Sequence, residues 1–143
     1  MRSIYKWWSA LVVVAILVQV GAAGYGAFYV AKHADDEGEF VTHKQFEHGW
    51  DFHAGFGYIV VLGLLILLVL ALIARLGRPR IWLPLGLAVA GILQVIFAWL
   101  GDGVPGLGFL HPINAFAILA MAGANARLAW SAAQPASASA PAA

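Results

Sequence analysis

The sequence predicts an all-α integral membrane protein, a bundle of four helices that each cross the bilayer. Hydrophobic residues make up 62% of the chain and charged residues only 10%, whereas soluble domains carry about 25% charged residues. Four apolar segments are long enough to cross a hydrocarbon core of about 30 Å, which takes roughly 20 residues in a helix. Apolar and polar residues do not alternate along these segments, which excludes a membrane β-barrel.

The four predicted spans cover residues 7–30, 52–76, 81–100 and 109–130. They form one transmembrane domain, residues 1–130. Residues 131–143 contain only Ala, Ser, Pro and Gln, so we expect a disordered tail.

The N-terminal segment has an alternative interpretation as a cleavable signal peptide. Arg2 and Lys6 precede an apolar run that reaches small residues at 21–24. The apolar stretch continues past these small residues to Val30, however, and is long enough to span. We therefore favour a retained first helix.

Basic residues flank alternate ends of the spans and predict the topology. Six of the eight Lys and Arg residues lie at the ends that would share one side: Arg2, Lys6, Arg75, Arg78, Arg80 and Arg127. By the positive-inside rule, both termini are cytoplasmic and the acidic loop after the first span faces outward. We expect a multi-pass protein of the cytoplasmic (inner) membrane, with the lipid bilayer as a partner and no nucleic acid.

The chain contains no cysteine. This excludes disulfides, thiolate metal sites, iron–sulfur clusters and covalent haem attachment through Cys-x-x-Cys-His. Any metal chemistry must use histidine, carboxylate or methionine.

His53 and His111 are the main candidates for a functional site. Each stands at the entrance of a long apolar run, where a histidine is costly unless it has a partner. The second and fourth spans both run inward from the outside, so the two histidines should converge at similar depth. Pro112 suits the first turn of a helix and places His111 at the outer boundary. For His111, an interfacial ring that reaches water is the alternative.

Small residues near the histidines leave room for a flat ligand. Gly57 and Ala115 follow His53 and His111 by one helical turn, and Gly24 lies at the same level of the first span. Ordinary packing of small residues between membrane helices is the alternative explanation.

Three amides complete the candidate site. Gln19 and Gln94 are the only strongly polar residues deep in the first and third spans. Each is expected to bond across to another helix or, alternatively, to a cofactor edge. Asn114 lies one turn below His111 and is a candidate to orient the ligand shell or a propionate.

The two halves of the chain resemble each other. Residues 16–20 match residues 92–95 around the two glutamines, and residues 74–76 match residues 126–128. In each half a Gln-bearing helix leads outward and a His-bearing helix leads back, which indicates a two-fold related bundle.

These residues resemble a known family. Gln19, the run from His53 to Gly57, Gln94 and the run Leu110-His111-Pro112-Ile113-Asn114-Ala115 resemble four-helix membrane proteins of the DUF6220 type, over about residues 11–130. The pattern is also similar in plan to one half of a haem A synthase, and this resemblance implies haem ligation by His53 and His111. That enzyme has Glu one turn before its helix-two histidine, whereas Trp50 stands here, so only the ligand geometry is carried over.

The leading functional prediction is a bis-histidine b-type haem protein that transfers electrons near the outer face. Two axial histidines leave the iron no open site, so electron transfer is favoured over catalysis. Quinone is a second candidate cofactor, and the short chain suggests an accessory subunit of a larger redox complex or a homo-oligomer.

Two other classes remain open. One is a structural subunit without cofactor. The other is a transporter or metal-handling protein that uses the outer loop, where His43 and Glu47 join the carboxylates of residues 35–39. A solvated acidic loop without a ligand is favoured over that cation site.

Overall fold

The computed structural model describes residues 1–34 and 40–132, and all regular secondary structure within them is helical. The helices are α1 (Arg2–Ala34), α2 (His43–Ile73), α3 (Arg78–Gly103), the single turn α4 (Pro105–Gly108) and α5 (Leu110–Ser131). Four segments are long and apolar enough to cross a membrane: α1, α2, α3 and α4 together with α5. The all-α fold and the four candidate spans are confirmed. The predicted disordered tail, residues 133–143, lies outside the described residues.

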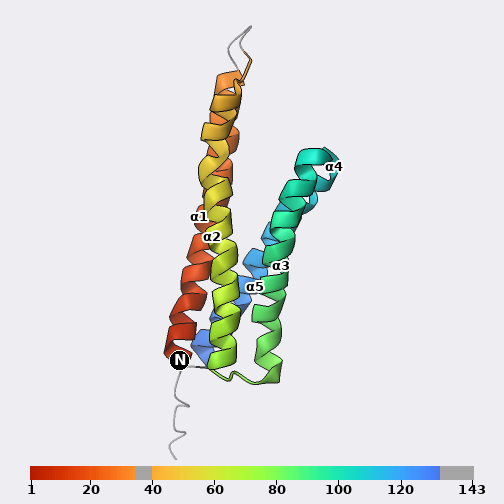
Figure 1. Cartoon of the computed structure of the whole chain (residues 1–143). Helices are drawn as coiled ribbons and strands as arrows, with labels where there is room; N and C mark the ends of the chain where they lie inside the picture. The colour runs from red at the N-terminus through yellow and green to blue at the C-terminus, as the bar shows by residue number, and fades with distance from the viewer. Residues whose placement is uncertain (35–39, 133–143) are drawn as a thin grey trace, which may run out of the picture.

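The long helices form a ring in the order α1, α2, α3, α5. Each packs against its two neighbours in this order, so α2 lies diagonally opposite α5, and α1 opposite α3. Figure 1 shows α1 and α2 running side by side, while α3 leans away from α2 toward its α4 end. The two helices that carry the candidate histidines therefore face each other across the bundle rather than pack directly.

The apolar core occupies the end of the bundle where α1 begins and α5 ends. It consists of Tyr5, Val12, Ile16, Val60, Leu64, Leu67, Ala71, Leu87, Ala90, Ile118 and Ala122. Gly91 marks its upper limit on α3, where an added Cβ would lie 2.8 Å from Cδ1 of Leu64. Beyond Gly91 on α3, and before Ile118 on α5, no described residue is buried. The four helices therefore pack tightly at one end, and toward the other end α3 leans away from the α1–α2 pair.

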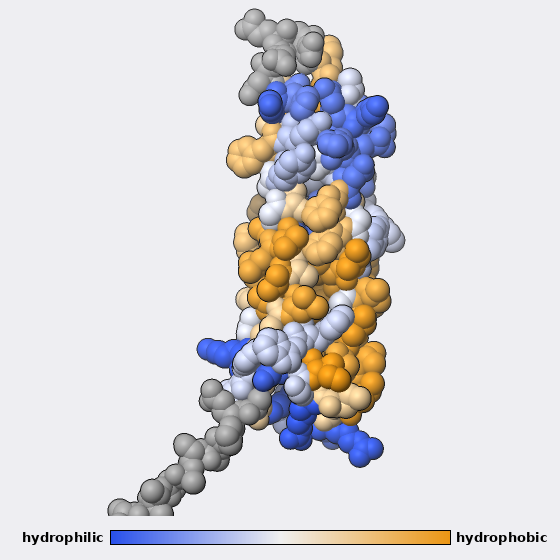
Figure 2. Space-filling view, turned by 90° about the vertical axis from the view of Figure 1, so that its left-hand side faces the viewer, coloured by the Kyte–Doolittle hydropathy of each residue, from blue (hydrophilic) through white to orange (hydrophobic). Residues whose placement is uncertain are grey.

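Helices α1 and α2 extend well past this core. They contain 33 and 31 residues, or about 50 and 46 Å at 1.5 Å per residue, against a hydrocarbon core of about 30 Å. Figure 2 shows hydrophilic residues at both ends of the molecule and a hydrophobic band between them. This pattern fits a bundle whose α1–α2 pair projects beyond the bilayer.

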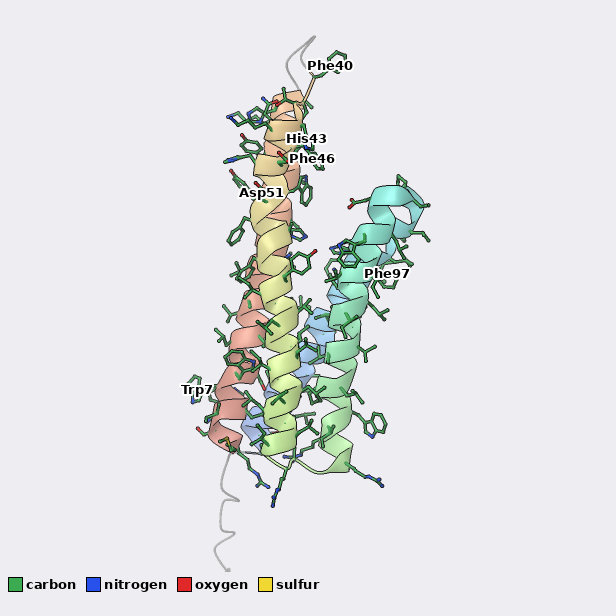
Figure 3. The ribbon with its side chains drawn as sticks, viewed as in Figure 1. Trp7, Phe40, His43, Phe46, Asp51 and Phe97 are labelled. Atoms are coloured by element: carbon green, nitrogen blue, oxygen red, sulfur yellow. The ribbon has the colours of Figure 1, made fainter. Side chains whose placement is uncertain are left out.

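The prediction that residues 43–51 belong to an outer loop was wrong. Helix α2 begins at His43, and Figure 3 shows His43, Phe46 and Asp51 on its projecting end. Thr42 caps this end: its Oγ1 accepts from the Gln45 backbone N–H at 3.3 Å, and Gln45 Oε1 accepts from the Thr42 N–H at 2.8 Å. This capping box starts the helix in a polar segment because it satisfies two otherwise unpaired backbone donors.

The connection between α3 and α5 is short. Val104 is extended (φ −136°, ψ 94°) and separates α3 from the single turn α4. Gly101 permits this compact reversal, since a Cβ there would lie 2.8 Å from the Gly108 Cα.

Candidate functional site: a facing histidine pair

The bundle brings His53 and His111 together. His53 lies on α2 and His111 in the first turn of α5, and their ring centres are 6.1 Å apart with an angle of 66° between the ring planes. Both rings are half-buried and lie above the apolar core, where the helices part. The predicted convergence of the two histidines is confirmed.

Each histidine is oriented by a backbone carbonyl of the preceding long helix. His53 Nδ1 lies 3.2 Å from the Gln19 carbonyl oxygen, and His111 Nδ1 lies 3.0 Å from the Gln94 carbonyl oxygen. Because a carbonyl can only accept, Nδ1 must carry the hydrogen and donate it. The network therefore assigns the tautomer in which Nε2 of the neutral ring keeps its lone pair, the form that binds metals.

The two halves repeat this arrangement. In each, the glutamine-bearing helix supplies a main-chain carbonyl to the histidine of the next membrane span. The sequence indicated a Gln–His repeat but not its physical basis, because the repeated contact uses the glutamine backbone rather than its side chain. A carbonyl oxygen has a second lone pair, so it can accept from the histidine as well as from the helix.

The side-chain amides bond within the bundle. Gln19 Nε2 donates to the His53 carbonyl at 2.7 Å, so α1 and α2 are joined by two reciprocal bonds. Asn114 Nδ2 donates to Gln94 Oε1 at 2.7 Å and to the Ala90 carbonyl at 2.8 Å. Asn114 therefore ties α5 to α3 and supports His111 from one turn below. Gln19 Oε1 is buried without a partner among the described residues.

The small residues divide into two kinds. A Cβ at Gly57 would lie 2.9 Å from Gln19 Nε2, so this glycine makes room for the Gln19 amide. A Cβ at Gly24 or Gly55 would meet nothing within 4 Å, so these backbones face open space. Ala115 is half-buried beside Asn114. Of the small residues singled out for a flat ligand, Gly24 retains space around it, whereas the space at Gly57 is taken by Gln19.

The histidine pair has the separation that two ligands of one metal require. With metal–nitrogen distances of about 2 Å on each side, two facing imidazoles have ring centres about 6 Å apart, close to the 6.1 Å found. The described residues contain no group of three or more His, Asp or Glu side chains placed to hold a metal ion. Two imidazoles complete a coordination shell only if other ligands come from elsewhere, as the four nitrogens of a macrocycle do. The separation of the ring centres is therefore compatible with a haem iron held by both histidines, whose ring planes are inclined by 66°.

The other three histidines lie on the projecting ends of α1 and α2. His33 Nδ1 lies 2.8 Å from the Tyr29 carbonyl oxygen, and the Tyr29 ring contacts both His33 and His48, with centres 4.4 and 5.0 Å apart. His43 Nε2 lies 3.0 Å from a carboxylate oxygen of Glu47 at an exposed position. The carboxylates considered for a cation site at residues 35–39 lie outside the described residues.

Two aromatic contacts near the site were not predicted from the sequence. Trp50 packs edge-on against His53, with ring centres 5.6 Å apart. Trp99 Nε1 donates to the Tyr58 hydroxyl at 3.3 Å, which links α3 to α2 beside the site. The spacing of Trp50 one turn before His53 was the available signal for the first contact.

Comparison with known proteins gives one match. A family of unknown function, DUF6220, matches residues 36–101, somewhat less than half of the chain. The matched stretch includes His53 and Gln94, whereas Gln19 and His111 lie outside it. No curated protein and no solved structure matches the chain.

Proposed function

We propose that this protein is a membrane haem protein in which His53 and His111 are the axial ligands of one haem b. The observation that carries the proposal is the facing pair of rings 6.1 Å apart, each with Nδ1 held by a backbone carbonyl. The similarity in plan to one half of a haem A synthase supports the same ligands but rests on the short sequence runs alone.

The residues around the pair define what the site would do. The carbonyls of Gln19 and Gln94 fix both rings and strengthen Nε2 as a ligand, because an Nδ1–H that donates raises the basicity of the other nitrogen. With both axial positions filled by protein, a bound haem would supply one-electron redox chemistry rather than oxygen activation. Electron transfer is thus the reaction that the ligand set favours.

The proposal includes a location and partners. Both termini would face the cytoplasm and the α1–α2 projection the outside of the inner membrane, as the basic residues indicate. The histidine pair then lies toward the outer face, where quinone or another subunit of a redox complex would exchange electrons with it.

Spectroscopy of the purified protein from haem-replete cells tests the assignment. Wild type should show the Soret and alpha bands of a low-spin haem on reduction. His53→Ala and His111→Ala should each abolish these bands while leaving membrane insertion intact. His33→Ala and His48→Ala are matched controls on the same helix pair and should retain them. A low-spin spectrum that survives the double change at His53 and His111, or a wild type without haem, refutes the proposal.

A structural subunit without cofactor is the second candidate. It is favoured by close glycine packing, since a Cβ at Gly26 would lie 2.7 Å from the Gly49 carbonyl oxygen and one at Gly91 2.8 Å from Leu64. Such contacts give helix association without any ligand. The absence of haem bands in the wild-type protein would support this candidate.

A further inference from the structure

A second feature lies at the opposite end of the bundle from the histidine pair. A cavity of about 340 Å³ opens where α1 begins, α3 begins and α5 ends. Its lining includes three cationic side chains from two elements, Arg2 and Lys6 of α1 and Arg80 of α3. Figure 2 shows hydrophilic residues gathered at this lower end of the molecule.

No Asp or Glu side chain is among the described residues that line the cavity. All seven acidic residues of the sequence fall within residues 35–51 or at position 102, so residues 1–34, 52–101 and 103–143 contain none. Those that the structure describes, Glu47, Asp51 and Asp102, belong to the far end of α2 or α3. Among the described residues the lining of the cavity is therefore positively charged, and an anionic ligand would balance this charge.

Two residues that line the cavity, Tyr5 and Asn125, form a hydrogen-bond network with Ser9. The Tyr5 hydroxyl donates to Asn125 Oδ1 at 2.6 Å, Asn125 Nδ2 donates to Ser9 Oγ at 3.1 Å, and Ser9 Oγ donates to the Tyr5 carbonyl at 2.8 Å. Tyr5, Ser9 and Asn125 are all buried, at 4%, 1% and 4% exposure. These bonds hold the Tyr5 and Asn125 side chains in place. They do not involve the cationic groups of the lining, which could bind a ligand.

The remaining walls favour an amphipathic ligand. Leu76, Leu83 and Leu128 line the cavity together with the basic residues. Lys6 Nζ lies 4.3 Å from the centre of the Trp130 ring, a cation–π contact that orients the ammonium group. Basic cavities between membrane helices bind the head groups of acidic lipids.

We propose that this cavity is a binding site for the phosphate group of an anionic phospholipid. Arg2, Lys6 and Arg80 would bind the phosphate, and the leucines would contact the glycerol and the first acyl carbons. A free phosphate ion carries the same negative charge but has no apolar part to contact the leucines. The lipid is favoured because it can contact both the cations and the leucines. The site is independent of haem binding.

Retention of lipid by the full-length protein tests this proposal. Protein from vesicles of phosphatidylcholine with a minor fraction of phosphatidylglycerol is transferred to detergent, and retained lipids are counted by native mass spectrometry. Wild type should retain phosphatidylglycerol in preference to phosphatidylcholine. The double variant Arg2→Gln, Arg80→Gln should lose this preference, by about fivefold for each cation removed.

The matched control is the double variant Arg75→Gln, Arg127→Gln. It removes the same charge from the same end, but neither residue lines the cavity, so its preference should equal that of wild type. Circular dichroism and gel filtration confirm that both variants fold. Three results would overturn the site: an equal loss in the control, no preference in wild type, or full displacement of the lipid by inorganic phosphate, which would indicate a soluble ligand.

Discussion

At the scale of single residues, His53 and Gln19 form a reciprocal pair. The histidine ring donates to the Gln19 carbonyl, and the Gln19 amide donates to the His53 carbonyl. This pairing leaves His53 with one orientation and one tautomer, which is the preorganisation a metal ligand needs. It also depends on a glycine at position 57, the only residue small enough to admit the Gln19 amide.

Gly57→Ala should therefore destabilise the protein. The new Cβ would lie 2.9 Å from Gln19 Nε2, and displacing the amide weakens its bond to the His53 carbonyl. Because this amide ends a flexible side chain and can shift, we expect a loss of about 0.5–1.5 kcal/mol in the free energy of unfolding relative to Gly55→Ala, from the weakened hydrogen bond, measured by denaturant titration in detergent.

Gly55→Ala is the matched control for this change. The two glycines are two residues apart on α2, but a Cβ at Gly55 meets nothing within 4 Å. Replacing a helical glycine by alanine in open space should be neutral or stabilise by up to about 1 kcal/mol. Equal changes in the free energy of unfolding for Gly57→Ala and Gly55→Ala would show that the contact with Gln19 does not determine the effect at position 57.

At the scale of the elements, α1 and α2 are joined along most of their length. At the level of the histidines, the His53–Gln19 pair joins the two helices. Closer to the start of α2, Gly26 packs against Gly49, and both glycines are buried. The two helices remain together past the level where α3 turns back. The projection therefore does not need α3 or α5 to support it.

Gly26→Ala should separate the outer parts of α1 and α2. An added Cβ would lie 2.7 Å from the Gly49 carbonyl oxygen, and a backbone atom cannot swing aside as a side chain can. We expect a loss of at least about 1–3 kcal/mol in the free energy of unfolding and faster hydrogen exchange of amides in residues 43–50. Gly21→Ala, on the same helix but in open space, should change neither quantity. Unaltered exchange in Gly26→Ala would mean that the glycine contact does not hold the projection.

At the scale of the whole molecule, charge is separated along the bundle. Six basic residues belong to the end with the lipid-phosphate cavity, and all seven acidic residues belong to residues 35–51 or position 102. The apolar core lies nearer the basic end and the histidine pair nearer the acidic one. This asymmetry favours one orientation in the bilayer.

The topology that follows is open to direct measurement. Reporter fusions after Phe40 and after Ala143 should give opposite sidedness, with the C-terminal fusion in the cytoplasm. The physical reason is that Lys and Arg near span ends resist translocation. If both fusions report the same side of the membrane, the topology with four spans and the α1–α2 connection outside is wrong.

The four spans could be predicted from the amino-acid sequence alone, because runs of about 20 apolar residues have no stable alternative to a helix in lipid. It also predicted that His53 and His111 meet, since the second and fourth spans share a direction and each histidine stands at the same end. Both predictions depend only on the lengths of the apolar segments and on their order along the chain, which can be read from the sequence.

The contacts that form the site could not be predicted from the sequence and follow from the packing of the helices. In the structure both histidine Nδ1 atoms donate to backbone carbonyls, and Asn114 bonds to α3. Gly57 packs against the Gln19 amide, whereas Gly24 faces open space. Every residue has a carbonyl, so a side-chain pattern cannot show which one accepts an extra bond. A glycine is likewise the same residue whether it faces a neighbour or a void, and the difference is set by the relative rotation of packed helices.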